Sequence, residues 1–134
     1  MATIFTKIIR GEIPCYKIAE NSRFFSFLDI RPASKGHTLV IPKAETDYLF
    51  DLDDKDLADM VVFAKSVAKA MDKALSPIRT GVIVEGMEVP HAHIHLIPIY
   101  SEGQKLVLGG HVELSQDEMA EIAARIRKEW EAGA

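Results

Sequence analysis

The chain lacks the features that mark exported, membrane-spanning or nucleic-acid-binding proteins. Its single cysteine, Cys15, can form neither an internal disulfide nor a cysteine zinc cluster, which is typical of a reducing compartment. No apolar run approaches the ~20 residues that span a bilayer, and no basic segment followed by a long apolar one opens the sequence. The formal net charge is −4, without a basic stripe. We therefore expect a cytoplasmic protein that binds neither membranes nor nucleic acids.

The composition is that of one ordinary globular domain. Of the 134 residues, 48% are hydrophobic and 27% are charged, which is enough to bury a core within a single unit. Because there is no repeat, low-complexity stretch or linker, residues 1–134 are expected to form one domain. Short apolar segments surround one long helical pattern without regular β-α-β alternation. This order predicts an α+β fold with a mainly antiparallel sheet.

Local patterns place the individual elements. A long central helix should begin after Asp53 or Asp54, either of which can cap it, and end before Pro77. A C-terminal helix should begin at the capping-box sequence SQDE, residues 115–118. A short helix is expected at residues 3–9, and strands are expected at residues 16–19, 24–28, 37–41, 80–85 and 91–98. The apolar positions of the central helix, which are expected to face the core, are Leu57, Met60, Val61, Ala64, Val67, Ala68, Met71 and Leu75.

The most informative segment is PHAHIHLIP, residues 90–98, which contains three of the five histidines. Successive side chains of a strand point to opposite faces, so His91, His93 and His95 are expected in a row opposite the apolar side chains that alternate with them. Imidazole titrates close to neutral pH, which suits nucleophilic, proton-transfer or metal-ligand chemistry. This row is the candidate active site.

A row of histidines can also be structural or can bind a metal ion. A structural row is costly, because burying imidazoles without partners costs roughly 1–3 kcal/mol each, so such a core needs a network or ligand to satisfy them. In a metal site, His91, His93 and His95 would be the ligands of a hydrolase or a metal-binding protein. No carboxylate or cysteine stands close in sequence to complete a metal site, although folding can supply one.

Four segments together resemble the histidine-triad (HIT) family of nucleotide hydrolases and transferases. The sequence HAHIHLI at residues 91–97 fits the family signature of histidines alternating with hydrophobic residues. The sequences IFTKII (residues 4–9), FLDI (27–30) and GHTLVIPK (36–43) match its other segments in the expected order. The resemblance covers about residues 3–100, whereas the tail at 101–134 varies within the family. Among the branches, the chain most resembles the purine nucleoside phosphoramidases.

The resemblance implies a fold and a set of catalytic roles. It implies a five-stranded antiparallel sheet with helices, usually paired in a homodimer, that binds a purine nucleotide with its α-phosphate over the histidine row. By this likeness His93 attacks the α-phosphorus and forms a covalent nucleotidyl-histidine, from which water or another acceptor removes the nucleotide. His95 hydrogen-bonds the phosphate, while His91 and His37 orient His93 and fix its tautomer.

The resemblance also implies a nucleotide-binding set. Its members are Phe27, Leu28, Asp29, Ile30, Val84 and Glu88. Asp29 resembles the carboxylate that accepts hydrogen bonds from the ribose hydroxyls, and the apolar residues beside it wall the base. Val84 and Glu88 stand where many members place polar side chains near the phosphate. A carboxylate facing a phosphate repels it unless the carboxylate is protonated or turned away.

The resemblance implies no required cofactor. Zinc-containing relatives have a cysteine pair where this chain has Thr3 and Thr6, so no structural zinc and no metal ligand is expected. Three function classes remain. The first is a nucleotidyl hydrolase or transferase that acts on a phosphoramidate or a dinucleoside polyphosphate and releases an AMP-type product. The second is a metal-dependent hydrolase or metal-binding protein, and the third is a nucleotide-binding regulatory protein whose turnover is incidental, for which Val84 and Glu88 are the hint.

Overall fold

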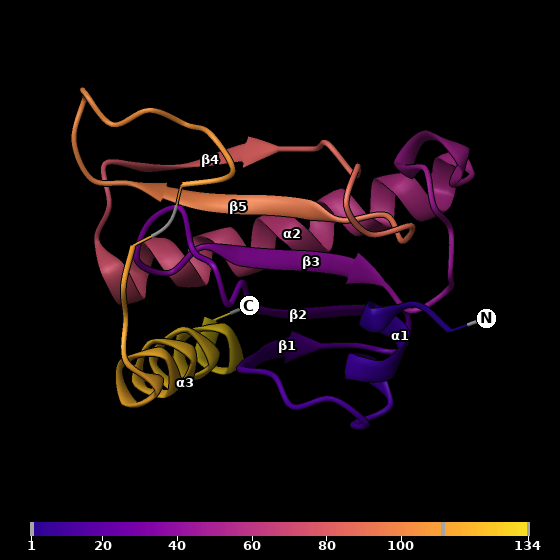
Figure 1. Cartoon of the computed structure of the whole chain (residues 1–134), viewed down its shortest axis with the longest axis horizontal. Coiled ribbons are helices and arrows are strands. Elements are labelled where there is room, and N and C mark those ends of the chain that lie inside the picture. The colour runs from indigo at the N-terminus through magenta and orange to yellow at the C-terminus, as the bar shows by residue number, and fades with distance from the viewer. Residues whose placement is uncertain (1, 111, 134) are drawn as a thin grey trace.

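The computed structural model describes residues 2–110 and 112–133. In chain order the elements are α1 (Ile4–Ile9), β1 (Lys17–Glu20), β2 (Phe24–Leu28), β3 (Thr38–Pro42), the 3₁₀ helix η1 (Leu49–Asp51), α2 (Asp54–Leu75), β4 (Arg79–Ile83), β5 (Ile94–Ile99) and α3 (Gln116–Gly133). The strands form one antiparallel sheet in the order β1-β2-β3-β5-β4 (Figure 1). This confirms the expected α+β fold with a five-stranded sheet, a long helix and a C-terminal helix. No helix in the described parts of the chain has the length and hydropathy needed to cross a membrane.

Both long helices begin at the caps that the sequence indicates. The Asp53 carboxylate accepts the main-chain N–H of Asp56 at 2.8 Å and so starts α2. The helix stops at Ser76, which adopts a left-handed conformation with φ of 51° before the proline. At α3, the Ser115 hydroxyl accepts the Glu118 N–H at 3.1 Å, while the Glu118 carboxylate accepts the Ser115 N–H at 3.2 Å. The capping box is therefore formed as predicted.

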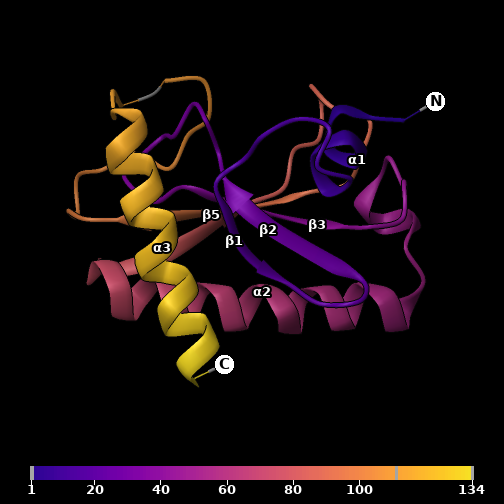
Figure 2. The same ribbon diagram turned by 90° about the horizontal axis from the view of Figure 1, so that it is seen from below.

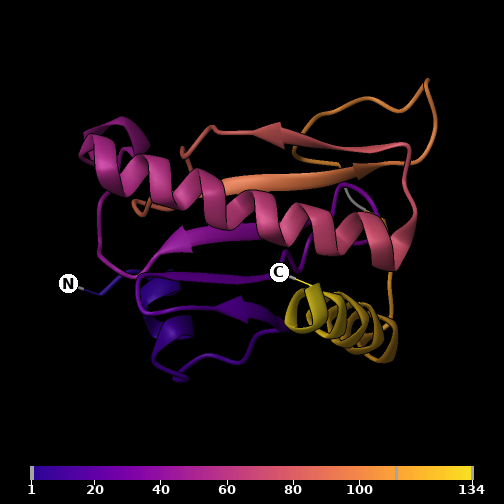
Figure 3. The ribbon, with the colours of Figure 1, turned by 180° about the vertical axis from the view of Figure 1, so that it is seen from behind.

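The sheet separates two layers of different character. The helices α2 and α3 cover one face, and the short helix α1 lies against the other (Figures 2 and 3). The helix-covered face holds the larger core, which includes Leu28, Val40, Ile94 and Leu96 from the strands. The α1 side holds a smaller apolar cluster, whose buried members are Phe5, Phe25, Phe27, Leu39 and Ile41. Alternation along β2 and β3 sends neighbouring side chains to opposite layers.

The strand β5 is shorter at its start than the sequence predicts. It begins at Ile94 rather than His91, because the main chain before it bonds elsewhere. The N–H of His91 donates to the carbonyl of Val89 at 2.8 Å, and the N–H of Ala92 donates to the carbonyl of Thr46 at 2.6 Å. The first two triad histidines therefore lie in an irregular segment that approaches the sheet, and only His95 lies within the strand.

Candidate active site

The three triad histidines form one row on the α1 side of the sheet, as the alternation predicts. The rings of His93 and His95 lie 4.9 Å apart between centroids, and Phe5 of α1 packs edge-on against His91 at 5.7 Å and His93 at 5.2 Å. All three are buried, with 0%, 6% and 7% exposure from first to last. The side chains that alternate with them, Ala92, Ile94 and Leu96, lie in the core on the opposite face.

His93 is held with one ring nitrogen occupied and the other available. Its Nδ1 lies 2.8 Å from the main-chain carbonyl oxygen of His91. A carbonyl can only accept, so the partner assigns the proton to Nδ1 and leaves the lone pair on Nε2. Nothing in residues 2–110 or 112–133 hydrogen-bonds that Nε2. A neutral imidazole with a free, oriented Nε2 is what a nitrogen nucleophile requires.

His37 and His95 form a directed chain of hydrogen bonds that starts at the main chain. The N–H of Ala33 donates to Nδ1 of His37 at 2.9 Å, so in the neutral ring the His37 proton is on Nε2. That Nε2 lies 2.9 Å from Nδ1 of His95 and donates to it. His95 therefore carries its own proton on Nε2. One main-chain amide thus sets the tautomer of two histidines and gives His95 a free N–H donor beside His93.

Burial keeps these rings uncharged at neutral pH. It lowers the pKa of His37 to about 4. The pKa of His95 is also lowered to about 4, first by burial and then by the neighbouring His93 and His37. Burial lowers the pKa of His91 as well, against the opposing effects of the Pro42 carbonyl and Glu45. At pH 7 the rings of His37, His91 and His95 are therefore neutral, each with a defined donor nitrogen and a defined acceptor nitrogen.

Asp29 stands at the end of the His37–His95 pair. Its Oδ2 lies 3.6 Å from Nε2 of His37, and its Oδ1 accepts the main-chain N–H of Arg31 at 2.9 Å. Burial raises the pKa of this carboxyl. Because His37 is neutral, the contact is not an ion pair. Asp29 is brought to the histidine row, as the sequence analysis expects.

Within the described residues, one group of three potential metal ligands converges, and it is not the triad row. It consists of Asp29, His37 and His95, whose ligand atoms lie within 4.8 Å of one another. In the neutral ring, however, His37 carries its proton on Nε2, because Nδ1 accepts from Ala33. To ligate a metal, His37 would have to move that proton to Nδ1, against the Ala33 N–H. The hydrogen bonds of His37 therefore favour a ring with its proton on Nε2, which cannot bind a metal ion through that nitrogen.

The structure divides the expected base-binding residues between the two faces of the sheet. Phe27 belongs to the α1-side cluster and packs against the Phe5 ring at 5.7 Å. Leu28, in contrast, is 1% exposed in the core beneath the helices. The expectation that Leu28 walls the base is wrong, since consecutive strand residues point to opposite faces. Ile30, which follows the strand, is 75% exposed.

Val84 and Glu88 lie in the connection between β4 and β5. Val84 is 43% exposed and Glu88 is also exposed. Val89, next in the chain, packs against the α1-side cluster, which brings this connection to the histidine side of the sheet. Their part in phosphate binding stays a prediction.

Several contacts of the site have no clear signal in the sequence. The donor to His37 is the main-chain N–H of Ala33, and the identity of the residue at position 33 gives no indication of this contact. Thr3 places its hydroxyl 2.7 Å from Nδ1 of His91 across 88 positions, and Phe5 packs on two triad rings. The only hint is that Thr3 precedes the short helix as a cap residue and Phe5 is one of its apolar positions.

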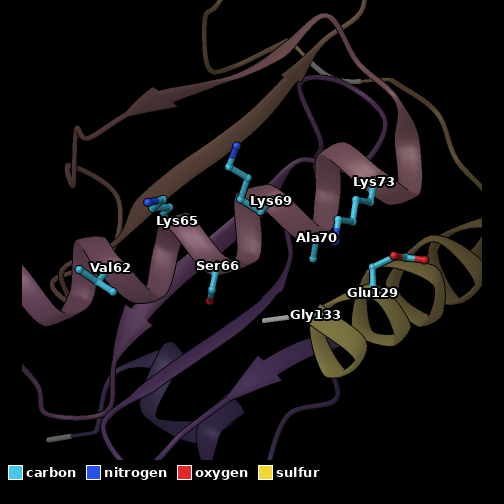
Figure 4. A pocket seen from close by; sticks show the side chains of 8 residues that line it. All are labelled: Val62, Lys65, Ser66, Lys69, Ala70, Lys73, Glu129 and Gly133. Atoms are coloured by element: carbon cyan, nitrogen blue, oxygen red, sulfur yellow. The ribbon is translucent and has the colours of Figure 1, made fainter.

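A hollow of ≈ 260 Å³ lies away from the histidines, between α2 and α3 (Figure 4). Lys65, Lys69 and Lys73 line its α2 side at four-residue spacing, and Glu129 stands on the α3 side. These helices cover the face opposite the triad, so this hollow is not part of the histidine site.

The fold and the site agree with a known family. A model of the HIT domain matches residues 10–102. The chain belongs to the HIT family. The adenosine 5'-monophosphoramidase HNT1 of Saccharomyces cerevisiae is 40% identical over 109 residues, covering 81% of this HIT protein and 69% of the yeast protein.

Solved structures of HIT proteins match over nearly the whole chain. A Hit-like protein involved in cell-cycle regulation from Bartonella henselae superposes with a TM-score of 0.84 at 33% identity, covering 95% of both chains. A Zn-bound histidine triad family protein from Mycobacterium smegmatis superposes with a TM-score of 0.83 at 28% identity, covering 98% of this chain and 95% of that one. The expected family and fold are confirmed.

Proposed function

We propose that this HIT protein is a nucleoside phosphoramidase that hydrolyses the bond between the α-phosphorus of a purine nucleotide and its leaving group. The observation that carries the proposal is the orientation of His93, whose Nδ1–H donates to the His91 carbonyl and whose Nε2 is free. The similarity to a yeast protein named an adenosine 5'-monophosphoramidase supports the substrate class. Dinucleoside polyphosphates are the second substrate class to be tested.

The proposed reaction has two displacement steps at phosphorus. In the first, the bridging nitrogen of the phosphoramidate takes a proton from water, Nε2 of His93 attacks the α-phosphorus, and the P–N bond breaks so that the nitrogen leaves as a neutral amine. In the second, water attacks the phosphorus of the nucleotidyl-histidine, the bond to Nε2 breaks, and AMP and a proton are released. His95 presents its Nε2–H to a phosphoryl oxygen and stabilises the charge that gathers there.

The nucleotide would be held by the residues around the row. Asp29 is proposed to accept hydrogen bonds from the ribose hydroxyls, because its carboxylate stands next to His37 at the edge of the row. Phe27 is buried in the apolar cluster on the same side of the sheet and would lie beneath the base, and Ile30 offers an exposed apolar surface. His37 does not reach the phosphate in this scheme; it acts through the hydrogen bond that orients His95.

Metal-dependent hydrolysis is the second candidate, favoured by the convergence of Asp29, His37 and His95. The two candidates differ in their response to a chelator. Turnover of an adenosine phosphoramidate is measured with and without EDTA, and the reaction is quenched in base, where a phosphohistidine survives. Chelator-resistant turnover with nucleotide on His93 supports the proposal. Chelator-sensitive turnover supports the metal route, and tight AMP binding without turnover supports a regulatory protein.

We also propose that the protein forms a homodimer across β4 and α2. The strand β4 is an edge of the sheet, and its Val82 is 58% exposed. Val61 of α2 is 52% exposed, although its spacing predicts a core position. It lies three turns before Asp72, which bonds Thr80 of β4, so both valines border the same edge. Exposed apolar side chains next to unpaired strand groups are typical of an interface.

A further inference from the structure

One hydroxyl group connects the N-terminal helix to the triad. The Oγ1 of Thr3 accepts the main-chain N–H of Thr6 at 3.0 Å, which makes Thr3 the N-cap of α1. The same oxygen lies 2.7 Å from Nδ1 of His91. Phe5, two residues further on, packs against the His91 and His93 rings. The helix α1 is thus docked on the triad from the open side of the sheet (Figure 2).

The direction of the Thr3–His91 hydrogen bond follows from the other nitrogen of the ring. The Nε2 of His91 lies 2.7 Å from the carbonyl oxygen of Pro42, so it must carry the proton. His91 is 0% exposed, and an uncharged ring then has its lone pair on Nδ1. Thr3 is therefore the donor and His91 the acceptor.

The Thr3 hydroxyl proton has two acceptors within reach, Nδ1 of His91 at 2.7 Å and Oγ1 of Thr6 at 3.2 Å, and the contact with His91 is the shorter one. The Glu45 carboxylate accepts the main-chain N–H of Thr3 at 2.9 Å and also the hydroxyl proton of Thr6. Because the Thr6 hydroxyl donates to Glu45, it offers an acceptor and not a donor to Thr3. The next residue, Thr46, accepts the N–H of Ala92 through its carbonyl at 2.6 Å. Residues 45–46 therefore hold both the start of α1 and the histidine segment.

We propose that Thr3, held in place by Glu45 and Thr6, is a positioning residue: its hydroxyl and the Pro42 carbonyl hold the two ring nitrogens of His91, and this fixes the His91 carbonyl that orients His93. The catalytic part of this inference rests on the proposed function, in which His93 is the nucleophile. Without the Thr3 donor, the buried Nδ1 of His91 has no partner. The ring is then held only at Nε2, by the Pro42 carbonyl, and the His91 carbonyl that binds Nδ1–H of His93 loses part of its support.

The test compares Thr3→Val, which keeps the shape and removes the hydroxyl, with Thr3→Ser, which keeps the hydroxyl. Long-range ¹H–¹⁵N spectra of the imidazoles report the tautomer of His91 directly, and steady-state kinetics on an adenosine phosphoramidate report kcat and KM. We expect Thr3→Val to keep the Nε2–H form, which the Pro42 carbonyl requires, and to shift the ¹⁵N resonance of the His91 Nδ1, which loses its donor. Its kcat should fall about tenfold with little change in KM, as when the partner that orients a functional histidine is removed. Thr3→Ser should restore both readouts.

Asp53→Ala provides the matched control for the loss of a helix cap. Asp53 caps α2 as Thr3 caps α1, and its side chain bonds the main chain of Asp56. Thermal unfolding of both variants should show a comparable loss of stability. The His91 spectrum and kcat of Asp53→Ala should match the wild type, which separates the loss of a cap from the loss of the hydrogen bond to His91.

Two results would overturn the proposal. One is a wild-type spectrum in which His91 carries its proton on Nδ1, a measurement that needs no variant to fold. The other is a folded Thr3→Val protein with the wild-type His91 spectrum and kcat. The spectra do not depend on turnover. If the wild type fails to hydrolyse phosphoramidates, the proposed function fails, while the His91 spectra still decide whether Thr3 sets the ring.

Discussion

His37 donates a hydrogen bond from Nε2 to Nδ1 of His95 across a distance of 2.9 Å. The direction is fixed because the other nitrogen of His37 accepts the Ala33 N–H. The Ala33 N–H thereby orients the His95 ring through His37. Neither ring is charged at pH 7. The unpaired nitrogen of His95 is therefore an N–H donor, whereas the unpaired nitrogen of His93 carries a lone pair. Displacement at a phosphoryl group requires both a nucleophile and a donor to the phosphoryl oxygens.

Replacing the nucleophile should separate binding from chemistry. We expect His93→Ala to lose turnover by about a thousandfold or more, as removal of a covalent nucleophile does. AMP binding, measured by calorimetry, should persist because base and ribose contacts provide most of it. Near-UV circular dichroism checks that the variant is folded. A variant that retains more than a small fraction of wild-type turnover would show that His93 is not the nucleophile.

The buried neutral histidines should make stability depend on pH. The pKa values of His37 and His95 are about 4 in the folded protein, below the value of 6.5 that the unfolded chain provides. Between these pH values the unfolded chain binds more protons, so the free energy of unfolding should fall as the pH is lowered from about 6.5 to 4, by on the order of 5 kcal/mol for the two rings together. Urea unfolding across this range measures the slope.

The pH dependence of the free energy of unfolding should be compared between the wild type and His37→Asn. The substitution removes one of the two titrating rings, and the pH dependence should become shallower. Asp29 acts in the opposite direction at the acid end, because its pKa is raised by burial and the folded carboxyl takes up its proton first. Equal slopes for the wild type and His37→Asn would contradict the assignment of neutral, buried rings.

Phe27 and Leu28 offer a test of the two faces of β2. Both are buried, at 4% and 1% exposure, and truncation to alanine should cost each about 2–5 kcal/mol of unfolding free energy. Only Phe27→Ala should weaken nucleotide binding, because Leu28 points into the core beneath the helices. The measurements are urea unfolding and AMP titration. Weakened binding in a folded Leu28→Ala protein would place that side chain near the base after all.

The connection between β4 and β5 should limit the rate. Where Val84 replaces a polar amide, one donor toward the phosphate is missing, and such a donor is typically worth about ten- to a thousandfold in rate. We expect Val84→Asn combined with Glu88→Ser to raise kcat/KM on an adenosine phosphoramidate. Both positions are exposed, so the fold should tolerate the change. Glu85→Ser, in the same connection, is the control for the loss of one negative charge. A folded double variant that is slower than the wild type would show that the wild-type connection supplies its own phosphate contacts.

The proposed dimer should be visible by light scattering. We expect a mass of about twice the 14.9 kDa of one chain at micromolar concentration. Val82→Lys places a charge on the exposed edge strand and should shift the protein toward monomer, whereas Ile4→Ser, which removes an exposed apolar side chain from α1, should not. A wild-type mass near that of one chain counts against the interface.

Local sequence patterns are sufficient to predict the helices, the histidine row and the family. The capping residues set the starts of α2 and α3, because those hydrogen bonds join residues three apart. Alternation predicted that His91, His93 and His95 lie opposite the core residues between them, and they do, although only His95 lies within the strand. The same alternation places Phe27 and Leu28 on opposite faces of the sheet. The expectation for Leu28 was wrong because it assigned both neighbours to the base pocket on the family resemblance alone.

The orientation of the histidines depends on contacts between distant parts of the chain. The tautomer of His95 depends on His37, 58 positions away, and that of His91 on the Pro42 carbonyl, 49 positions away. The strand start at Ile94 depends on the Thr46 carbonyl, which takes the N–H of Ala92. A hydrogen bond between distant residues requires packing to bring donor and acceptor together, and no local pattern encodes it. The sequence therefore names the reacting residues, and the folded chain decides which nitrogen of each one is free.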